Sequence, residues 1–216
     1  MPTEQVSAAC VWALPVAAYL YGSVPFGFLA AKALRGVDIR RTGSGNIGAT
    51  NAARVLGFRF FPIIFLLDLS KGLVPALAAA RLSAAGPYSP ALPAVITGLA
   101  AILGHVFPIY LRFKGGKAVA TGTGVFLALA PLAVGVAAAV WAVVFGLWRY
   151  VSLASISAAV ALAASAWLVY EAPLGPGRYR TLLATVACAF VIYLHRANIR
   201  RLLSGTEHRI GRKRAD

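Results

Sequence analysis

Two polar, glycine-rich segments of this chain have the residue types that grip an anionic group. The first is Ser44-Gly45-Asn46-Ile47-Gly48-Ala49-Thr50-Asn51 with Arg54 beyond its end, and the second is Lys114-Gly115-Gly116-Lys117. Glycines let backbone N–H groups approach an anion, hydroxyl and carboxamide groups add hydrogen bonds, and Arg and Lys supply charge. Both segments lie between apolar stretches, where polar backbone must be enclosed by protein or water. They indicate a membrane enzyme or a carrier for phosphorylated molecules.

The second segment is not a nucleotide-hydrolysing loop. It lacks the G-x-x-x-x-G-K-[ST] spacing, and no strand is expected before it. Taken alone, it is a basic loop between membrane helices. Beside the first segment, phosphate binding becomes the favoured interpretation.

General acid–base groups are scarce. The only histidines are His105, His195 and His208, and none has an aspartate five residues later, so the common His-x4-Asp acyltransferase dyad is absent. No Gly-x-Ser-x-Gly elbow occurs, which argues against an esterase of the usual type. We expect His105 to be a satisfied packing or capping group.

Composition places the chain in a membrane. Of its 216 residues, 60% are hydrophobic and 12% are charged, against about 25% charged residues in average globular proteins. The net charge of +15 fits anionic lipid headgroups and anionic substrates. Uncharged runs of this length exclude a nucleic-acid-binding protein. Cys10 and Cys188 form no metal-ligand pattern, and we expect neither a metal nor a cofactor.

The hydropathy pattern predicts an all-α, polytopic helix bundle with seven transmembrane helices in a single domain, residues 1–216. The first apolar run lacks the basic start of a cleavable signal peptide and is expected to remain as a span. Gly86–Pro90 predicts a turn, and Pro131 is expected to divide 118–148 into two short helices, because one helix of that length would reach about 46 Å. The expected crossings are 5–31, 60–80, 91–111, two within 118–148, 150–170 and 181–195.

Charge supports this count. With seven crossings, 17 of the 21 Lys and Arg residues fall on one side of the membrane, and only Arg81, Arg178 and Arg180 fall on the other. The positive-inside rule then places the N-terminus outside and the C-terminus in the cytoplasm. Four polar clusters are expected to converge on the cytoplasmic face: 44–54, 112–117, 149–155 and 195–207.

The order of motifs resembles one family. Ser44 to Gly57, then Gly104-His105 with Phe113 to Thr121, then Arg149 to Ile156, then His195-Arg196-Ala197-Asn198-Ile199 with Glu207, resemble the bacterial acyl-phosphate:glycerol-3-phosphate acyltransferase (PlsY) family. The resemblance runs from the first span to the tail. It implies a multi-pass enzyme of the bacterial inner membrane that transfers a fatty acyl group from acyl phosphate to the 1-hydroxyl of glycerol 3-phosphate. The products would be lysophosphatidic acid and phosphate, in the first acylation of phospholipid synthesis.

The resemblance also implies roles for individual residues. Ser44 and Arg54 would serve the phosphorylated substrates, and Ser152 and Asn198 would line the glycerol phosphate site. Which of Lys114 and Lys117, and of Ser152 and Ser155, makes each contact stays open. The expected catalytic residues are Ser44, Arg54, Lys117, Ser152 and Asn198. The expected substrate-binding residues are Asn46, Thr50, Asn51, Lys114, Gly115, Gly116 and Glu207. The partners would be the two substrates and membrane lipids, and we expect a monomer.

Two further acids have expected roles. Glu207 sits among cations and should act as an internal counter-ion that fixes the tail. Asp68 and Lys71 lie three residues apart inside a span, where each would cost about 2.5–3.5 kcal/mol if unpaired. Mutual pairing is therefore predicted. A carrier of phosphorylated solutes is the competing class, but transporters usually need polar access from both sides and often show paired repeats.

Overall fold

The computed structural model describes residues 8–84, 91–170 and 178–211, and every regular element in these ranges is helical. The predicted turn at Gly86–Pro90 lies outside them. The chain forms two compact units, 1–129 and 130–216, and each is described by itself.

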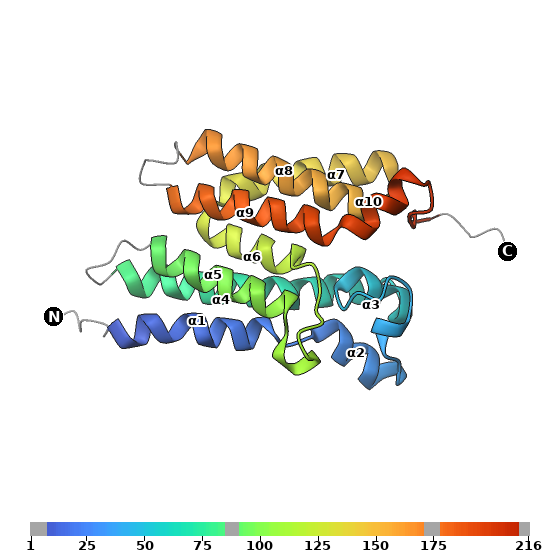
Figure 1. Ribbon diagram of the computed structural model, residues 1–216, viewed down its shortest axis with the longest axis horizontal. Helices are drawn as coiled ribbons and strands as arrows, with labels where there is room; N and C mark the ends of the chain where they lie inside the picture. The colour runs from blue at the N-terminus through green and yellow to red at the C-terminus, as the bar shows by residue number, and fades with distance from the viewer. Residues whose placement is uncertain (1–7, 85–90, 171–177, 212–216) are drawn as a thin grey trace. The chain divides into compact units, whose positions relative to one another are not determined.

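Unit 1 contains six α-helices and two short 3-10 helices within its described residues (Figure 1). In chain order these are α1 (Ala8–Gly22), α2 (Phe26–Arg35), η1 (Ile39–Arg41), α3 (Ala49–Leu56), α4 (Phe60–Ala84), α5 (Ala91–Val106), η2 (Ile109–Leu111) and α6 (Val119–Leu129). The long helix α4 packs against α1, α3, α5 and α6. It is therefore the element around which this unit is built.

The first apolar run contains one segment of spanning length, Trp12–Arg35, as predicted, but it is interrupted where the sequence predicted one continuous helix. α1 ends at Gly22, and α2 begins only at Phe26. Pro25 explains the break, because a proline disfavours helical backbone at the residue before it. α2 then ends at Gly36, which has the left-handed φ of 68°.

Glycines let α4 and α6 approach each other closely. A Cβ added to Gly72 would overlap the carbonyl oxygen of Thr121, and one added to Gly124 would overlap that of Leu69. Small residues permit this kind of backbone contact between membrane helices. The contact fixes the start of α6 beside the first half of α4.

Both glycine-rich segments adjoin the same end of unit 1. The first segment leads through α3 into the start of α4, and the second follows the end of α5 (Figure 1). Lys71, in the middle of α4, contacts His105 in the last turn of α5. α5 therefore ends beside the middle of α4, and the first half of α4 extends beyond it toward α3.

Unit 2 consists of α7 (Pro131–Trp148), α8 (Val151–Val169), α9 (Arg178–Leu194) and α10 (Arg196–Leu203) in its described residues. α7 packs along α8, and α8 packs along α9. The axis turns by 57° between α9 and α10. This bend brings the short basic helix α10 against α9 and against the start of α8.

The described residues contain five helical segments long and apolar enough to span a membrane, or six if bent α9 and α10 count as one span. Seven crossings are therefore not established. The predicted division at Pro131 is confirmed, because α6 ends at Leu129 and Pro131 opens α7. The shortfall lies mainly in α6, whose 11 residues reach only about 16 Å at 1.5 Å per residue.

Candidate functional site

The first segment is folded around the side chain of Asn51. Its Nδ2 donates to the backbone carbonyls of Ile39 at 2.8 Å, Thr42 at 3.1 Å and Asn46 at 2.9 Å, and its Oδ1 accepts from the N–H of Ser44 at 2.9 Å. Asn51 is only 2% exposed. The carboxamide predicted to bind substrate is thus engaged with the loop, and its role in the structure is to shape that loop.

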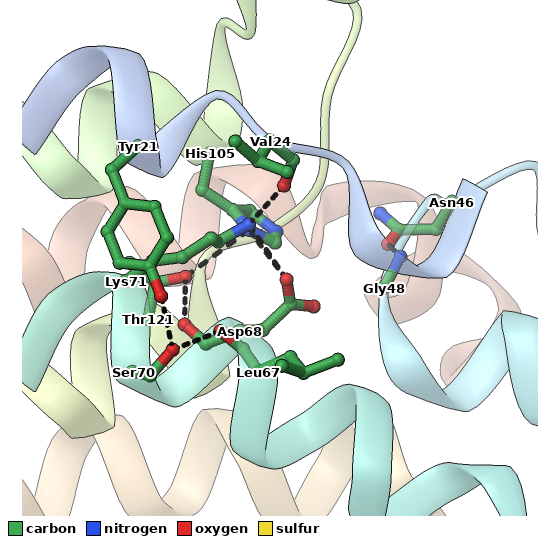
Figure 2. A network of polar contacts seen from close by, with 10 residues as sticks. All are labelled: Tyr21, Val24, Asn46, Gly48, Leu67, Asp68, Ser70, Lys71, His105 and Thr121. Atoms are coloured by element: carbon green, nitrogen blue, oxygen red, sulfur yellow. Dashed lines mark hydrogen bonds and ion pairs between the residues drawn. The ribbon is translucent and has the colours of Figure 1, made fainter. Parts of the chain in front are cut away.

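Two glycines and Asn46 complete this loop. Gly43 and Gly45 have positive φ of 57° and 69°, a conformation that glycine adopts without strain. A Cβ on Gly43 would also overlap Oδ1 of Asn51. Asn46 Oδ1 accepts from the N–H of Gly48 at 2.9 Å, just before α3 (Figure 2).

The loop leaves the predicted anion-binding side chains at its surface. Ser44 and Arg54 are exposed, and Thr50 is half-buried in the first turn of α3. Arg54 lies in the last turn of the same short helix. A rigid, buried scaffold thus carries hydroxyl and guanidinium groups that can meet a solute.

The second segment is tied to the end of α5 by its backbone. The N–H of Gly115 donates to the carbonyl of Val106 at 3.1 Å, and that of Gly116 donates to the carbonyl of His105 at 3.0 Å. A Cβ on Gly115 would overlap both of these carbonyl oxygens, and one on Gly116 would overlap the imidazole of His105. The glycines are needed for packing against residues 105–108.

The structure gives Gly115 and Gly116 a different role from the one that the sequence predicted. The sequence predicted that their N–H groups would meet a phosphate, but both groups are hydrogen-bonded within the fold. The first N–H groups of a helix lack intrahelical partners, and the first bond of α6 comes from Gly122 to Ala118. Donors for an anion are therefore better sought at Lys117 and the first turn of α6.

Burial separates the two lysines of the second segment. Lys114 is exposed and follows two residues with positive φ, Arg112 at 53° and Phe113 at 62°. Lys117 is half-buried between two buried residues, Gly116 and Ala118. The geometry favours Lys117 as the cation that the glycine loop positions.

A buried polar network lies beside this loop (Figure 2). Lys71 Nζ contacts Oδ1 of Asp68 at 2.7 Å, the carbonyl oxygen of Val24 at 2.9 Å and Nδ1 of His105 at 3.0 Å. Thr121 Oγ1 donates to the carbonyl of Asp68 at 2.9 Å. Lys71 is 0% and Asp68 is 2% exposed. The predicted pairing of Asp68 with Lys71 is confirmed, and so is the expectation that His105 is a packed group, because it is buried and its Nδ1 is hydrogen-bonded.

Unit 2 gathers its predicted residues on one carboxylate. Glu207 Oε1 accepts from Ser152 Oγ at 2.8 Å and from Asn198 Nδ2 at 2.7 Å, while Oε2 accepts from Arg201 Nε at 2.7 Å. Burial of Glu207 acts to raise its pKa, but the hydrogen bonds from Asn198, Ser152 and Arg201 outweigh it and lower the pKa. Glu207 is the predicted counter-ion of the tail.

The same cluster separates the two serines. Ser152 and Asn198 are both buried and share Oε1 of Glu207, whereas Ser155 Oγ accepts from Trp141 Nε1 at 3.4 Å. Ser152 is therefore the serine grouped with Asn198. That this cluster and the loops of unit 1 meet on one cytoplasmic face stays a prediction.

Sequence reasoning missed two parts of these clusters. Arg201 is assigned no role from the sequence, although its spacing from Glu207 could have suggested the ion pair between them. The contact between His105 and the glycine loop carries no spacing signal, because it depends on the fold. The described residues contain no group of three or more His, Cys, Asp and Glu side chains arranged to hold a metal ion.

Comparison with known proteins gives consistent results. The family model described as glycerol-3-phosphate acyltransferase matches residues 12–205. The glycerol-3-phosphate acyltransferase of Geotalea daltonii is 48% identical, with 90% of this chain and 95% of that protein covered. The one from Aquifex aeolicus is 47% identical, with 91% and 97% covered.

Two solved structures share the fold. The crystal structure of PlsY, an integral membrane glycerol 3-phosphate acyltransferase, in its glycerol 3-phosphate form has a TM-score of 0.84 and 42% identity, with 94% of this chain and 96% of that chain covered. Its lysophosphatidic acid form has a TM-score of 0.81 at the same identity and coverage. With several apolar helices of spanning length, this is a multi-pass bacterial membrane protein. The chain belongs to the glycerol-3-phosphate acyltransferase family, and its structural relatives are PlsY proteins.

Proposed function

We propose that the chain transfers a fatty acyl group from acyl phosphate to the 1-hydroxyl of glycerol 3-phosphate. The products are lysophosphatidic acid and phosphate, and the reaction is the first acylation of bacterial phospholipid synthesis. The observation that carries this proposal is the fixed Gly115–Lys117 loop, tied to α5 by two backbone hydrogen bonds, in a chain of this family. A rigid cationic loop suits a phosphate that must be held while its acyl group departs.

This donor needs no covalent nucleophile from the protein. Acyl phosphate is a mixed anhydride and is already activated. The glycerol hydroxyl attacks the acyl carbon, the new ester C–O bond forms, and the bond to the phosphate oxygen breaks. The hydroxyl proton goes to a substrate phosphate oxygen or to water. The protein contributes by positioning two anions and by offsetting charge on the departing phosphate.

Unit 1 supplies the groups for the phosphorylated substrates. Lys117 offsets the charge on the departing phosphate, and Lys114 adds to the local positive charge. Ser44 and Arg54 bind phosphate oxygens, with Thr50 beside them on α3. The fixed loop around Asn51 supports this role, because preorganised donors need no rearrangement during the reaction.

Unit 2 supplies the groups for the glycerol moiety. Ser152 and Asn198 contact the glycerol phosphate. Glu207 accepts hydrogen bonds from the O–H of Ser152 and from one N–H of Asn198. These bonds fix the direction in which each of the two side chains presents its remaining polar atoms. Glu207 thus orients the two groups that bind the acceptor.

We propose the same topology that the charges predict. The chain is one domain with seven crossings, in which α6 is a short membrane segment packed beside α4, and it acts as a monomer. The N-terminus is outside, and the tail and the active site face the cytoplasm. In a Cys10→Ala/Cys188→Ala background, Arg81→Cys should react with an impermeant maleimide added to intact cells, whereas Arg209→Cys should react only after the cells are permeabilised.

One assay tests the reaction. Purified protein in detergent receives acyl phosphate and labelled glycerol 3-phosphate, and labelled lysophosphatidic acid should appear. Acyl-CoA in place of acyl phosphate should give none. Vesicles that move glycerol 3-phosphate without acylating it would overturn the proposal in favour of a carrier.

Two substitutions test the site. Arg54→Ala and Lys117→Ala should each lower turnover by about 10²–10³, the loss typical when one charge-stabilising group is removed. Arg81→Ala is the matched control, because Arg81 is exposed in the last turn of α4 and has no assigned role. Rates near wild type in either site variant would show that the site is misplaced.

The direct attack has its own test. Rapid quenching with labelled acyl phosphate, in the absence of glycerol 3-phosphate, should leave no label on the protein. An acyl group trapped on Ser44 or Ser152 would establish a covalent mechanism instead.

A further inference from the structure

We infer that His105 is a substrate-binding residue, which donates a hydrogen bond from Nε2–H to the phosphate held by the Gly115–Lys117 loop. We infer also that Lys71 is a positioning residue, which holds the proton of this imidazole on Nε2. The inference rests on the proposed function and adds the imidazole of His105 to the substrate-binding groups.

Lys71 has as many hydrogen-bond acceptors around it as it has protons to donate. An ammonium group has three N–H donors and no acceptor. In the structure Nζ has three partners that accept: the carboxylate of Asp68, the carbonyl oxygen of Val24 and Nδ1 of His105. The carboxylate of Asp68, 2.7 Å away, is the counter-ion of this ammonium group. Each proton of Lys71 is thus directed at one acceptor.

The contact with Lys71 determines the tautomer of His105. A ring nitrogen that accepts from an ammonium group carries no proton, so the neutral imidazole has its proton on Nε2. Thr121 Oγ1 lies 3.2 Å from Nδ1, but this hydroxyl donates to the carbonyl of Asp68 and does not need a proton from the ring. The network therefore leaves one N–H on the ring, at Nε2.

Nε2 of His105 lies at the glycine loop. A Cβ on Gly116 would overlap Nε2, with the ring carbon Cδ2 at 2.9 Å and Cε1 at 3.2 Å. The polar edge of the ring therefore lies against Gly116, next to Lys117. His105 is only 4% exposed, and a hydrogen bond in such a dry place is electrostatically stronger than one in water.

His105 contacts the glycine loop through both its backbone and its ring. The N–H groups of Gly115 and Gly116 are bonded to α5, so the glycine loop needs a donor from elsewhere. His105 makes both contacts: its carbonyl fixes the backbone of Gly116, and its ring edge flanks the same residue. One residue can thus set the loop geometry and supply a neutral donor beside the cation of Lys117.

The tautomer can be observed directly. Protein carrying ¹⁵N-labelled histidine is reconstituted in nanodiscs, where only three imidazoles contribute signals, and His105→Gln identifies the signal of His105. We expect the Nε2–H tautomer, with a change at Nε2 when inorganic phosphate is added but not when chloride is added at equal ionic strength. A ring protonated on Nδ1, or one unaffected by phosphate, would overturn the inference.

Two variants separate donation from packing. Asn keeps an acceptor near the position of Nδ1 but offers no donor at Nε2, whereas Gln can place an N–H near Nε2. We expect His105→Asn to raise the KM for acyl phosphate about tenfold, the loss for one hydrogen bond to a charged group, with the KM for glycerol 3-phosphate unchanged. His105→Gln should restore most of the loss.

Ser70→Ala is the control. Ser70 is next to Lys71 on α4, and its replacement removes a hydrogen bond to Tyr21 of α1 while leaving the contacts of Lys71 in place. Its kinetic constants should equal those of the wild type. A purely structural His105 would impair both variants alike, or raise both KM values together. If acyl phosphate is not the donor, the acylation assay fails while the phosphate response of Nε2 persists, so the two failures are distinguishable.

Discussion

Asn198 Nδ2 lies 2.7 Å from Oε1 of Glu207 and donates a hydrogen bond to it. The same oxygen accepts from Ser152, and the other carboxylate oxygen pairs with Arg201. The Glu207 side chain is only 6% exposed. One carboxylate thus connects α8, α10 and the tail of unit 2.

Glu207→Gln should destabilise the protein and reduce acylation. It removes the charge that pairs with Arg201, and hydrogen bonds to charged groups are worth about 1.5–3 kcal/mol. Thermal unfolding in detergent should show a lower Tm, and the KM for glycerol 3-phosphate should rise because Ser152 and Asn198 lose their orientation. Thr206→Ala, which breaks only an exposed bond to Ser204, should change neither value.

Acid should remove the contribution of Glu207. Its pKa in the folded protein lies below the usual 4.5, so the unfolded chain binds the proton first as the pH falls. The stabilisation is therefore complete above about pH 5 and decreases as the pH drops through the folded pKa. The Tm difference between wild type and Glu207→Gln should shrink from pH 6 to pH 4. A constant difference would contradict this account.

Asn51→Asp should strongly lower turnover, although the two side chains have nearly the same size. The carboxylate keeps the acceptor for Ser44 N–H but has no N–H for the carbonyls of Ile39, Thr42 and Asn46, and it brings negative charge against these oxygens. A buried group left unsatisfied costs about 1–3 kcal/mol. Turnover and Tm should both fall. Thr50→Val, on the neighbouring position of α3, should lower turnover while leaving Tm near the wild-type value.

Several features were predictable because a local rule determines them. Asp68 and Lys71 are three residues apart on a helix, so their side chains meet whatever surrounds them. Pro131 suits the first turn of a helix and ends the preceding one. The break at Pro25 follows from the same kind of rule, and the prediction of one helix over 5–31 overlooked it.

The loop geometry was not predictable from local rules. Arg112, Phe113 and Ala118 all have positive φ, which non-glycine residues rarely adopt. Their residue types therefore do not predict this conformation. Tertiary contacts with α5 impose this conformation and turn the N–H groups of the glycines inward. The residue types of an anion-binding loop were thus recognisable, but the atoms available to the anion were not.

Gly124→Ala tests the close approach of α6 to α4, which holds Thr121 beside Asp68. Its Cβ would overlap the carbonyl oxygen of Leu69 and lie 2.8 Å from the N–H nitrogen of Leu73. Both are backbone atoms that cannot rotate away, so the helices must separate, and overpacking of this kind costs about 1–3 kcal/mol. Gly122→Ala, on the same helix with no atom within 4 Å of its added Cβ, is the control. Thermal unfolding should show a lower Tm for Gly124→Ala alone. Equal Tm values for the two variants would mean that the α4–α6 contact is looser than the structure has it.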